Sequence, residues 1–277
     1  MADTVVLPPA LPLTGPIHSL AEEEVLDALD PLRHLRESAA PDVGADSGST
    51  LLPAQPRSVL DEIIQLAFPL PPDSNVEEHV GGLQNSIAIQ LVVDASPGCG
   101  GVAWPAGEVL ARYIARRGLG SLAGRNVLEL GSGTGLVGLV AAHLGARVWI
   151  TDQAPLYPIM ERNIAFNDLA RSVTPAVLAW GEPIPSSIPP PSIILAADCV
   201  YFEPAFSLLV QTLADLTPTS DGPDPEILFC YKKRRKADKR FFALLKKKFT
   251  WTDIDDDPEH ALYSKEAISL LRLHPKR

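Results

Sequence analysis

The sequence predicts a doubly wound, mostly parallel α/β domain that ends in an antiparallel pair of strands and is preceded by a proline-rich extension. Three observations support this fold class. From residue 86 onward, short apolar segments alternate with segments of helical periodicity, which is the pattern of βαβ units. A glycine-rich turn, "GSGTG", joins one apolar segment to the helix that follows it. The length of 277 residues, of which 46% are hydrophobic, suits one large core rather than two.

Residues 1–72 are predicted to form a partly ordered extension, and residues 73–277 the folded domain. The extension is rich in proline and contains the stretch "AAPDVGADSGST", which can bury little apolar area. Two short helices are expected within it, one in "EEEVLDAL" after a capping box and one at 58–68, where Val59, Ile63 and Leu66 lie on one helical face. A substrate-docking arm is the alternative interpretation of this extension.

The folded domain is expected to begin with a strand at 86–93, where apolar residues recur with a period of two. A helix follows, with Pro105 in its first turn and Gly118 just after its end. Residues 126–152 then read as strand, helix and strand within about thirty residues, the length of a βαβ unit.

The remaining elements continue this alternation. In chain order they are a helix at 155–170, a strand at 192–201, a helix at 203–216, a fifth strand at 226–231 and a helix at 238–249. Two β-like stretches, "FTWTDI" and "AISLLRL", close the chain. We expect them to form an antiparallel hairpin, joined by a turn, on the edge of the parallel sheet.

The composition excludes several classes of function. A net charge of −10 and a pI near 5.1 argue against a general nucleic-acid binder. Cys99, Cys199 and Cys230 have no spacing typical of a metal site or a disulfide framework, so we expect no metal and a reducing compartment. The chain shows no signal peptide and no apolar run approaching the roughly 20 residues of a membrane span. We therefore expect a monomer of the cytosol or nucleus, with the cytoplasm as our assignment.

The glycine-rich turn raises the question of which nucleotide it binds. Its last part, "GTGLVG", is a literal G-x-G-x-x-G, which alone is weak evidence for a nicotinamide dinucleotide. The better pattern is an acidic residue, Glu129, followed by alternating glycines at Gly131, Gly133 and Gly135. Asp152, at the end of the next strand, lies about twenty residues beyond the first glycine, where a carboxylate accepts ribose hydroxyls.

The carboxylate before the turn decides between the two cofactor classes. Glu129 would repel a pyrophosphate but attract a cationic end, and S-adenosylmethionine carries both a sulfonium and an ammonium on its adenosine. The sequence also contains no Y-x-x-x-K pattern of the common hydride-transferring enzymes. We therefore expect S-adenosyl-L-methionine as the cofactor.

Several motifs together resemble a known family. In order they are "IAIQ", "GGVAWPAGEVLARYI", "VLELGSGTGLVG", "VWITD", "ERNIAFN", "LAWG" and "AADCVY". They make the stretch from about Ile87 to Leu273 similar to the seven-β-strand methyltransferases, specifically the eukaryotic protein-lysine methyltransferases that modify translation elongation factors and chaperones. The segment "YKKRRKADKRFFALL" is most similar to the fungal members that resemble elongation factor 1A lysine methyltransferases.

This resemblance implies a seven-stranded Rossmann-like sheet and a set of site residues. The positions where the family contacts its cofactor are Trp104, Glu129, Gly131, Gly133, Asp152, Trp180 and Ala197. The ends of the family's D-x-x-Y motif are Asp198 and Tyr201. Trp180 offers a flat face for adenine, although a core tryptophan is the alternative, and Ala179 stands where relatives often carry an acidic residue.

Asp198 and Tyr201 are the candidate catalytic residues. Methyl transfer depends on holding the acceptor nitrogen close to the methyl carbon, so positioning is the main task. A lysine must also lose its proton first, and a nearby carboxylate alone would oppose that loss. We expect Asp198 to capture and orient the incoming ammonium and Tyr201 to shape the channel. The alternative is that Asp198 only caps the helix that begins near Pro204.

The expected function is methylation of a protein lysine, with a translation elongation factor as the expected substrate. The basic run at 232–236 follows the fifth strand, on the edge of the active site, and suits an acidic surface of a protein partner; a solvated loop and an RNA contact are the alternatives. A protein histidine or a small amine could replace the lysine as acceptor. A cofactor-binding interaction protein without catalysis is the alternative from another class.

Overall fold

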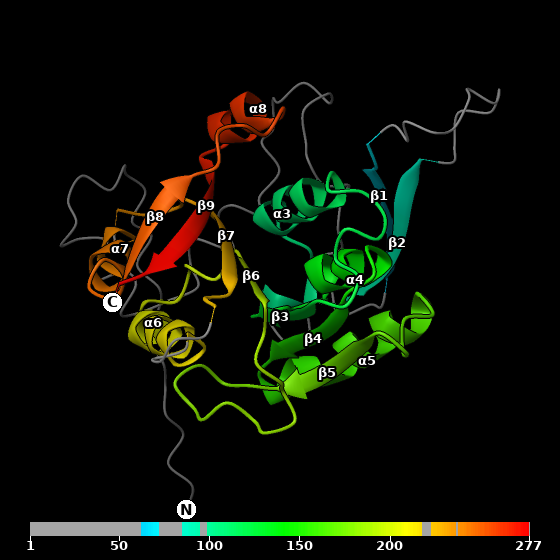
Figure 1. The fold of residues 1–277 in the computed structure, drawn as a ribbon, viewed down its shortest axis with the longest axis horizontal. Helices are drawn as coiled ribbons and strands as arrows, with labels where there is room; N and C mark the ends of the chain where they lie inside the picture. Colours follow the sequence, from blue (N-terminus) through cyan, green and yellow to red (C-terminus); the bar gives the residue numbers. More distant parts are fainter. Residues whose placement is uncertain (1–61, 72–84, 95–98, 218–222, 237, 277) are drawn as a thin grey trace, which may run out of the picture.

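The computed structural model describes residues 62–71, 85–94, 99–217, 223–236 and 238–276. The helix expected in "EEEVLDAL" lies outside these residues. Seven strands form the main sheet in the order β5-β4-β3-β6-β7-β9-β8, and two further strands, β1 and β2, form a separate ribbon (Figure 1). Within the described residues no helix is both long and apolar enough to cross a membrane.

The main sheet is parallel from β5 to β7. Its parallel strands are β3 (Asn126–Leu130), β4 (Arg147–Asp152), β5 (Val173–Val177), β6 (Ile193–Ala197) and β7 (Glu226–Lys232). The chain steps outward from β3 to β5 and then returns to the other side of β3 with β6. In a sheet of this kind, ligands bind at the carboxyl ends of the strands where the order reverses, here between β3 and β6.

Helices cover both faces of the sheet, as expected for a doubly wound fold. The helices are α3 (Pro105–Ala115), α4 (Leu136–His143), α5 (Tyr157–Phe166), α6 (Phe206–Asp215), α7 (Asp238–Leu245) and α8 (His260–Lys265). Alternate strand residues point to opposite faces: Val127 packs in the core with α3, α4 and α5, whereas Leu128 packs in the core with α6 and α7. Strands buried on both faces explain the continuous apolar runs of the sequence.

The closing strands differ from the expected simple hairpin. β9 (Ile268–Pro275) lies between β7 and β8 (Phe249–Asp253) and pairs antiparallel with both. The connection between β8 and β9 contains the helix α8 rather than only a turn. The expected pairing of these strands is confirmed, and the turn between them was wrong.

The segment at 58–68 was predicted to be helical; residues 58–61 lie outside the described residues, and for the rest the prediction was wrong. Glu62–Pro69 forms the strand β1, which pairs antiparallel with β2 (Ser86–Val93). Ile64, Leu66 and Phe68 are buried, so the burial follows a period of two rather than that of a helix. These side chains share one core with α3 and α4, although β1 precedes the domain boundary predicted at residue 72.

The membership of the seven-stranded sheet also differs from the expectation. β2 was counted as the first strand of the parallel series, but it belongs to the ribbon with β1. Its place is taken by β5, which the sequence analysis did not identify. β5 is short and contains Pro175, which lacks a ladder donor and is therefore tolerated at the edge position that β5 occupies.

Candidate active site

A cavity of about 270 Å³ opens at the carboxyl ends of β3, β4 and β6, at the point where the strand order reverses. All the site residues predicted from the sequence line it except Gly135. They come from separate segments: the start of α3, the turn after β3, the end of β4, the segment after β5 and the loop after β6. The fold therefore gathers side chains that are up to about a hundred positions apart in the sequence (Trp104 to Tyr201).

The turn after β3 is built from glycines because other backbone and side-chain groups approach it closely. Gly131 and Gly133 have positive φ values of 61° and 53°. A Cβ atom on Gly133 would lie 2.5 Å from the backbone oxygen of Gly100, and one on Gly131 would lie 2.8 Å from the Trp180 ring. Gly135 caps α4 in the left-handed conformation and stands just behind the cavity wall. The turn thus needs glycines because neighbouring groups pack directly against it, and Gly131 and Gly133 still line the cavity.

Glu129 is a buried carboxylate at the end of β3, only 2% exposed. One oxygen accepts a hydrogen bond of 2.9 Å from the backbone N–H of Gly138, in the first turn of α4. Burial raises the pKa of Glu129 to about 8, because little solvent remains to stabilise its charge. A cationic ligand would stabilise the ionised form. Glu129 is therefore chemically suited to the place expected for it, beside a positively charged group.

Gly138 is a residue whose importance the sequence analysis did not recognise. It is the last glycine of the G-x-G-x-x-G pattern, which was not accepted as evidence for a dinucleotide cofactor. A Cβ atom at this position would lie 2.8 Å from the Glu129 carboxylate and would clash with Ile150 on β4. The pattern itself was the available signal, since its third glycine serves close helix–strand packing.

Asp152 ends β4 and faces the glycine turn. Its Oδ2 accepts a hydrogen bond of 2.8 Å from the backbone N–H of Gly133, and its Oδ1 accepts one of 2.7 Å from Gln153. Burial raises the pKa of this carboxyl above its ordinary value, while the two N–H groups oppose that effect. The hydrogen bonds fix the carboxylate in the cavity wall, where lone pairs remain for the hydroxyls of a ribose.

Two half-buried tryptophans line the cavity on different sides. Trp180 packs over Gly131 and belongs to the core on the α6 face of the sheet. Trp104 precedes α3 and carries the guanidinium of Arg234 over its ring, 5.3 Å from the centroid. Ala197, at the end of β6, contributes a small side chain to the floor between them. Flat faces and a small floor residue leave room for an aromatic ring.

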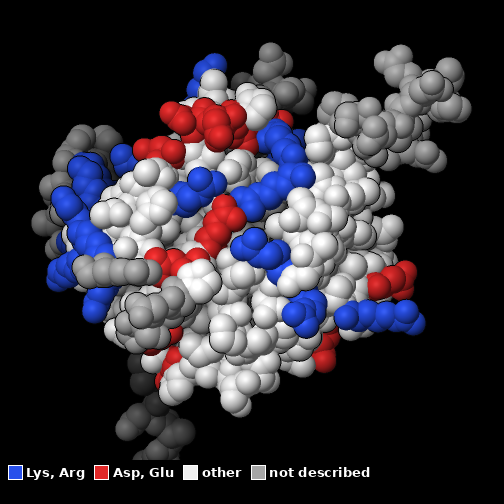
Figure 2. All heavy atoms as spheres, in the orientation of Figure 1, with Lys and Arg blue, Asp and Glu red and all other residues white. Residues whose placement is uncertain are grey.

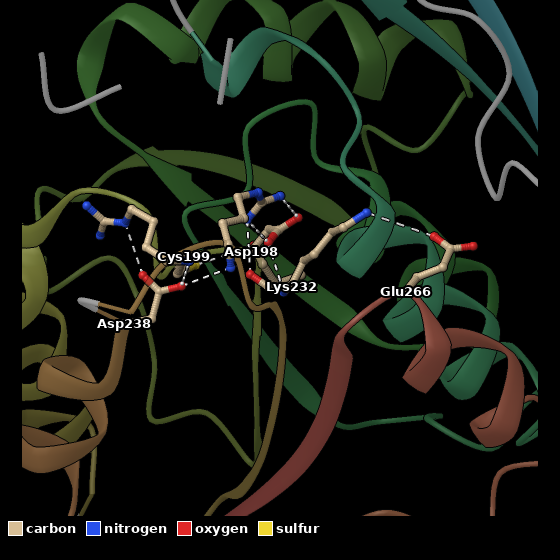
Figure 3. A network of polar contacts seen from close by, with 8 residues as sticks. Asp198, Cys199, Lys232, Asp238 and Glu266 are labelled. Atoms are coloured by element: carbon tan, nitrogen blue, oxygen red, sulfur yellow. Dashed lines mark hydrogen bonds and ion pairs between the residues drawn. The ribbon is translucent and has the colours of Figure 1, made fainter. Parts of the chain in front are cut away.

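Asp198 follows β6 in the left-handed conformation, with φ at 56°. Its two oxygens accept hydrogen bonds of 2.6 and 2.8 Å from the Nη1 and Nη2 atoms of Arg234 (Figure 3). The backbone N–H of Lys232 donates a third, of 3.2 Å, to Oδ1. The helical turn before α6 is capped instead by Phe202, without a side-chain hydrogen bond. The alternative interpretation of Asp198 as a helix cap is thus not what the structure shows.

The remaining residues of the D-x-x-Y loop have different surroundings. Tyr201 is half-buried and lines the cavity beside Asp198. Cys199 is buried, and its thiol donates to the backbone oxygen of Leu130 at 3.4 Å. Burial raises the pKa of this thiol well above its ordinary value, so it stays protonated and unreactive. Its assignment as a packing residue agrees with this environment.

The basic run at 232–236 is only partly a surface feature. The side chains of Arg234 and Arg235 are 3% and 2% exposed, and each pairs with a buried aspartate, Asp198 or Asp238. Lys233 and Lys236 are exposed. Figure 2 shows two other charged regions, acidic over the segment that holds α8 and basic over α7. Arg234 was not predicted as a site residue, because the basic run was expected to face an acidic surface of a protein partner and carries no local signal of burial.

A scan against protein-family models matches residues 83–248 to a family described as lysine methyltransferase. The match spans the glycine turn, both acidic strand ends and the D-x-x-Y loop. This chain belongs to the lysine methyltransferase family. The match covers more than half of the chain and ends within the segment that follows α7.

Named relatives agree with this assignment. The protein-lysine N-methyltransferase EFM6 of Saccharomyces cerevisiae is 38% identical over 229 residues, which are 71% of this chain and 92% of that protein. The protein N-lysine methyltransferase METTL21A of Mus musculus is 35% identical, over 61% of this chain and 78% of that protein. The EEF1A lysine methyltransferase 3 of Xenopus tropicalis is 30% identical, over 58% and 70%.

The protein is therefore a protein-lysine N-methyltransferase, and its cofactor is S-adenosyl-L-methionine, as expected from the sequence. The cavity residues fit this group. Gly131 and Gly133 line the cavity without side chains, Glu129 suits a cation, and Asp152 offers acceptors for hydroxyls. When bound, the cofactor supplies an electrophilic methyl group. The protein binds and orients the two reactants.

Proposed function

We propose that this methyltransferase modifies a lysine of a translation elongation factor in the cytoplasm. The name of the Xenopus relative, an EEF1A lysine methyltransferase, supports this substrate class. The observation that carries the proposal is the arrangement of the cavity, which has acidic groups at one end and a paired carboxylate beside a tyrosine at the other. The first end suits a cationic cofactor, and the second an amine acceptor.

We assign the cofactor contacts as follows. Asp152 accepts hydrogen bonds from the ribose hydroxyls, and Glu129 lies toward the cationic amino-acid end. Trp180 stacks on the adenine, with Ala197 beneath it, and Trp104 lies near the methionine end. The glycines at 131, 133 and 135 give the ligand access to backbone N–H groups at the start of α4. These assignments rest on the side chains that line one cavity.

Asp198 and Tyr201 are the residues that receive the acceptor lysine. Both line the same cavity as the proposed cofactor contacts, on the loop after β6. Asp198 orients the acceptor nitrogen by accepting its N–H, and Tyr201 forms the wall of the channel. Holding the two reacting atoms in line supplies on the order of 7–11 kcal/mol of the barrier reduction in favourable cases. Positioning thus supplies a large part of the expected rate enhancement, and the loss of the lysine proton is a separate requirement.

The substrate is a folded protein, and the enzyme acts on it as a monomer. Lys233 and Lys236 are exposed in the loop that carries Arg234, close to the cavity. They suit an acidic surface around the target lysine. Arg234 and Arg235 do not contribute to that contact, since both are buried in ion pairs.

The test is methylation of purified elongation factor 1A with labelled S-adenosyl-L-methionine, followed by mass spectrometry. We expect label on a lysine of the factor. The matched control pair is Asp152→Ala, which should abolish labelling, and Asp215→Ala, an exposed aspartate on α6 that should leave it unchanged. Label on a histidine or on a small amine would replace the acceptor class, and cofactor binding without label on any protein of a lysate would favour an interaction protein.

A further inference from the structure

The guanidinium of Arg234 lies beside Asp198 in the part of the cavity where the acceptor lysine is proposed to bind, called here the acceptor end. It makes a bidentate ion pair with Asp198, in which the two side chains are 3% and 4% exposed. Its flat face lies over the ring of Trp104. The carboxylate that was expected to capture an ammonium is therefore already matched by a cation of the protein.

This ion pair is fixed from both sides. The backbone N–H of Arg234 donates to Oδ2 of Asp238 at 3.0 Å, and the backbone N–H of Asp198 donates to the oxygen of Cys230 at 2.8 Å. Lys232 adds its own backbone donor to the Asp198 carboxylate. A pair held by this many contacts is a permanent part of the site and is not displaced when a substrate binds.

One atom of Arg234 remains without a protein partner. Its Nε is buried and has no hydrogen-bond acceptor among the described residues. Such orphaned buried donors are rare, because each costs the free energy of its lost hydration. Arg234 lines the cavity, so the open donor indicates a side chain that a ligand completes.

Two neighbouring cations also have acidic partners, while Lys233 and Lys236 are exposed on the same loop. Arg235 pairs with Asp238 on α7, and Lys232 lies 4.0 Å from Glu266, beyond α8 (Figure 3). The remaining titratable groups facing this region are the tyrosine of the D-x-x-Y loop, two buried thiols and the two carboxylates of the cofactor end: Tyr201, Cys199, Cys230, Glu129 and Asp152. The charge of Asp198 is thus cancelled by Arg234, whereas Glu129 and Asp152, on β3 and β4, have no cationic partner among the described residues.

Cancelling the charge of Asp198 resolves a conflict between two requirements, which are to orient the lysine nitrogen and to let it lose its proton. A free lysine has a pKa of about 10.4, and only its neutral form can attack a methyl group. A lone carboxylate beside it would raise that pKa, because an opposite charge favours the charged form. A carboxylate whose charge is cancelled can still accept an N–H and orient the nitrogen, without holding the proton on it.

We propose that Arg234 is a positioning residue that cancels the charge of Asp198 and thereby favours the neutral, nucleophilic form of the acceptor lysine. The inference rests on the proposed function. The ammonium first loses a proton to solvent. The lone pair of the amine then forms the N–C bond, while the bond from carbon to sulfur breaks and its electron pair stays on sulfur. The nitrogen keeps the positive charge that the sulfur loses.

The first test is the pH profile of methyl transfer under saturating cofactor. Arg234→Met leaves Asp198 charged, so we expect the profile to shift by about one unit or more to higher pH, with at least a tenfold lower rate at pH 7.5. The double variant Asp198→Asn with Arg234→Met removes both charges, and its profile should return to the wild-type position. Arg234→Lys keeps the charge without the bidentate geometry, and it should lower the rate without shifting the profile.

The matched control is Arg240→Met, which breaks an ion pair with Glu203 outside the cavity. It should leave both the rate and the profile unchanged. Thermal melting of each variant separates misfolding from a charge effect. An unshifted profile for Arg234→Met, or an equal shift for Arg234→Lys, would overturn the inference.

A second test needs no catalysis. Calorimetry gives the dissociation constants of cationic S-adenosyl-L-methionine and of its neutral product S-adenosyl-L-homocysteine. In Arg234→Met the bare carboxylate should favour the cation, so the ratio of the two constants should change at least threefold, and it should return in the double variant. An unchanged ratio overturns the role of Arg234. A wild-type enzyme that binds cofactor but methylates no lysine overturns the proposed function instead, and the binding ratio still decides on Arg234.

Discussion

The two ends of the cavity treat their carboxylates in opposite ways. Glu129 and Asp152 accept hydrogen bonds from backbone N–H groups and have no cationic side chain paired with them among the described residues. Asp198, on the neighbouring strand end, is matched by the full charge of Arg234. The difference matches the proposed ligands, which are a permanent cation beside Glu129 and Asp152 and an amine that has lost its proton beside Asp198. One fold thus tunes three carboxylates at adjacent strand ends for two tasks.

The largest effect is expected from Asp152→Ala at the cofactor end. The change removes two charge-assisted acceptors for ribose and the partner of the Gly133 N–H. Hydrogen bonds to charged groups contribute roughly 1.5–3 kcal/mol each, so cofactor affinity should fall by about 100-fold or more. Calorimetry measures this loss, and Asp215→Ala is the control on the surface of α6. Near-wild-type affinity in Asp152→Ala would show that the ribose contact lies elsewhere.

Gly133→Ala should separate close approach from backbone strain. Gly133 and Gly124 have similar positive φ values of 53° and 73°, so alanine at either position costs about 1–2 kcal/mol of stability. Only at Gly133 does the new Cβ atom meet a backbone oxygen, at 2.5 Å, whereas nothing lies within 4 Å at Gly124. Urea denaturation should therefore show a larger loss for Gly133→Ala, accompanied by loss of cofactor binding. Equal losses would mean that the turn moves aside without cost.

Glu129 makes cofactor binding depend on pH. Its pKa near 8 in the cofactor-free protein means that the carboxyl is protonated below that pH, and a bound cation favours the ionised form. Binding should release a proton, so affinity should rise by up to about tenfold per unit between pH 6 and 8. Calorimetry in buffers of different ionisation enthalpy counts the proton. Glu129→Gln should bind more weakly and without this slope, and a slope retained in that variant would assign the proton to another group.

As the pH rises, the same carboxyl strengthens cofactor binding but lowers the stability of the cofactor-free protein. Its pKa is raised in the folded state, so the folded protein holds a proton that the unfolded chain has already released. This contribution is complete below the ordinary value of 4.5 and is lost as the pH rises through about 8. Urea denaturation of the wild type and of Glu129→Gln between pH 5 and 8.5 should show a steeper fall in the wild type.

The smallest effect is expected from an ion pair that serves neither end. Arg240 and Glu203 are about one third exposed, so Arg240→Met should cost only about 0.2–1 kcal/mol of stability, and high salt should reduce it further. Thermal melting at low and high salt measures this difference. If Arg240→Met lowered the stability as much as Arg234→Met does, the buried ion pair of the site would not differ from an ordinary surface pair.

Four of the five parallel strands could be read from the sequence because they are short, mostly apolar runs, such as "NVLEL" and "IILAA", that alternate with helical patterns. The segment at 62–69 was misread because its apolar residues satisfy both periods over a short range, and only pairing with β2 selects the strand. The short strand β5, with its internal proline, carries too little local preference to be identified.

The sequence by itself determined the cofactor end of the site. Glu129, the glycines and Asp152 lie on two consecutive strand ends of one βαβ unit, where spacing along the chain fixes proximity in space. The tertiary structure alone decided that Asp198, which was predicted from the sequence, is paired with Arg234. Asp198 and Arg234 are 36 positions apart on the loops after β6 and β7, and they meet only because these strands pair side by side. In a sequence, a run of charged residues gives no sign that one of them is buried. In the structure, Arg234 is buried against Trp104 and the carboxylate of Asp198 and becomes part of the site.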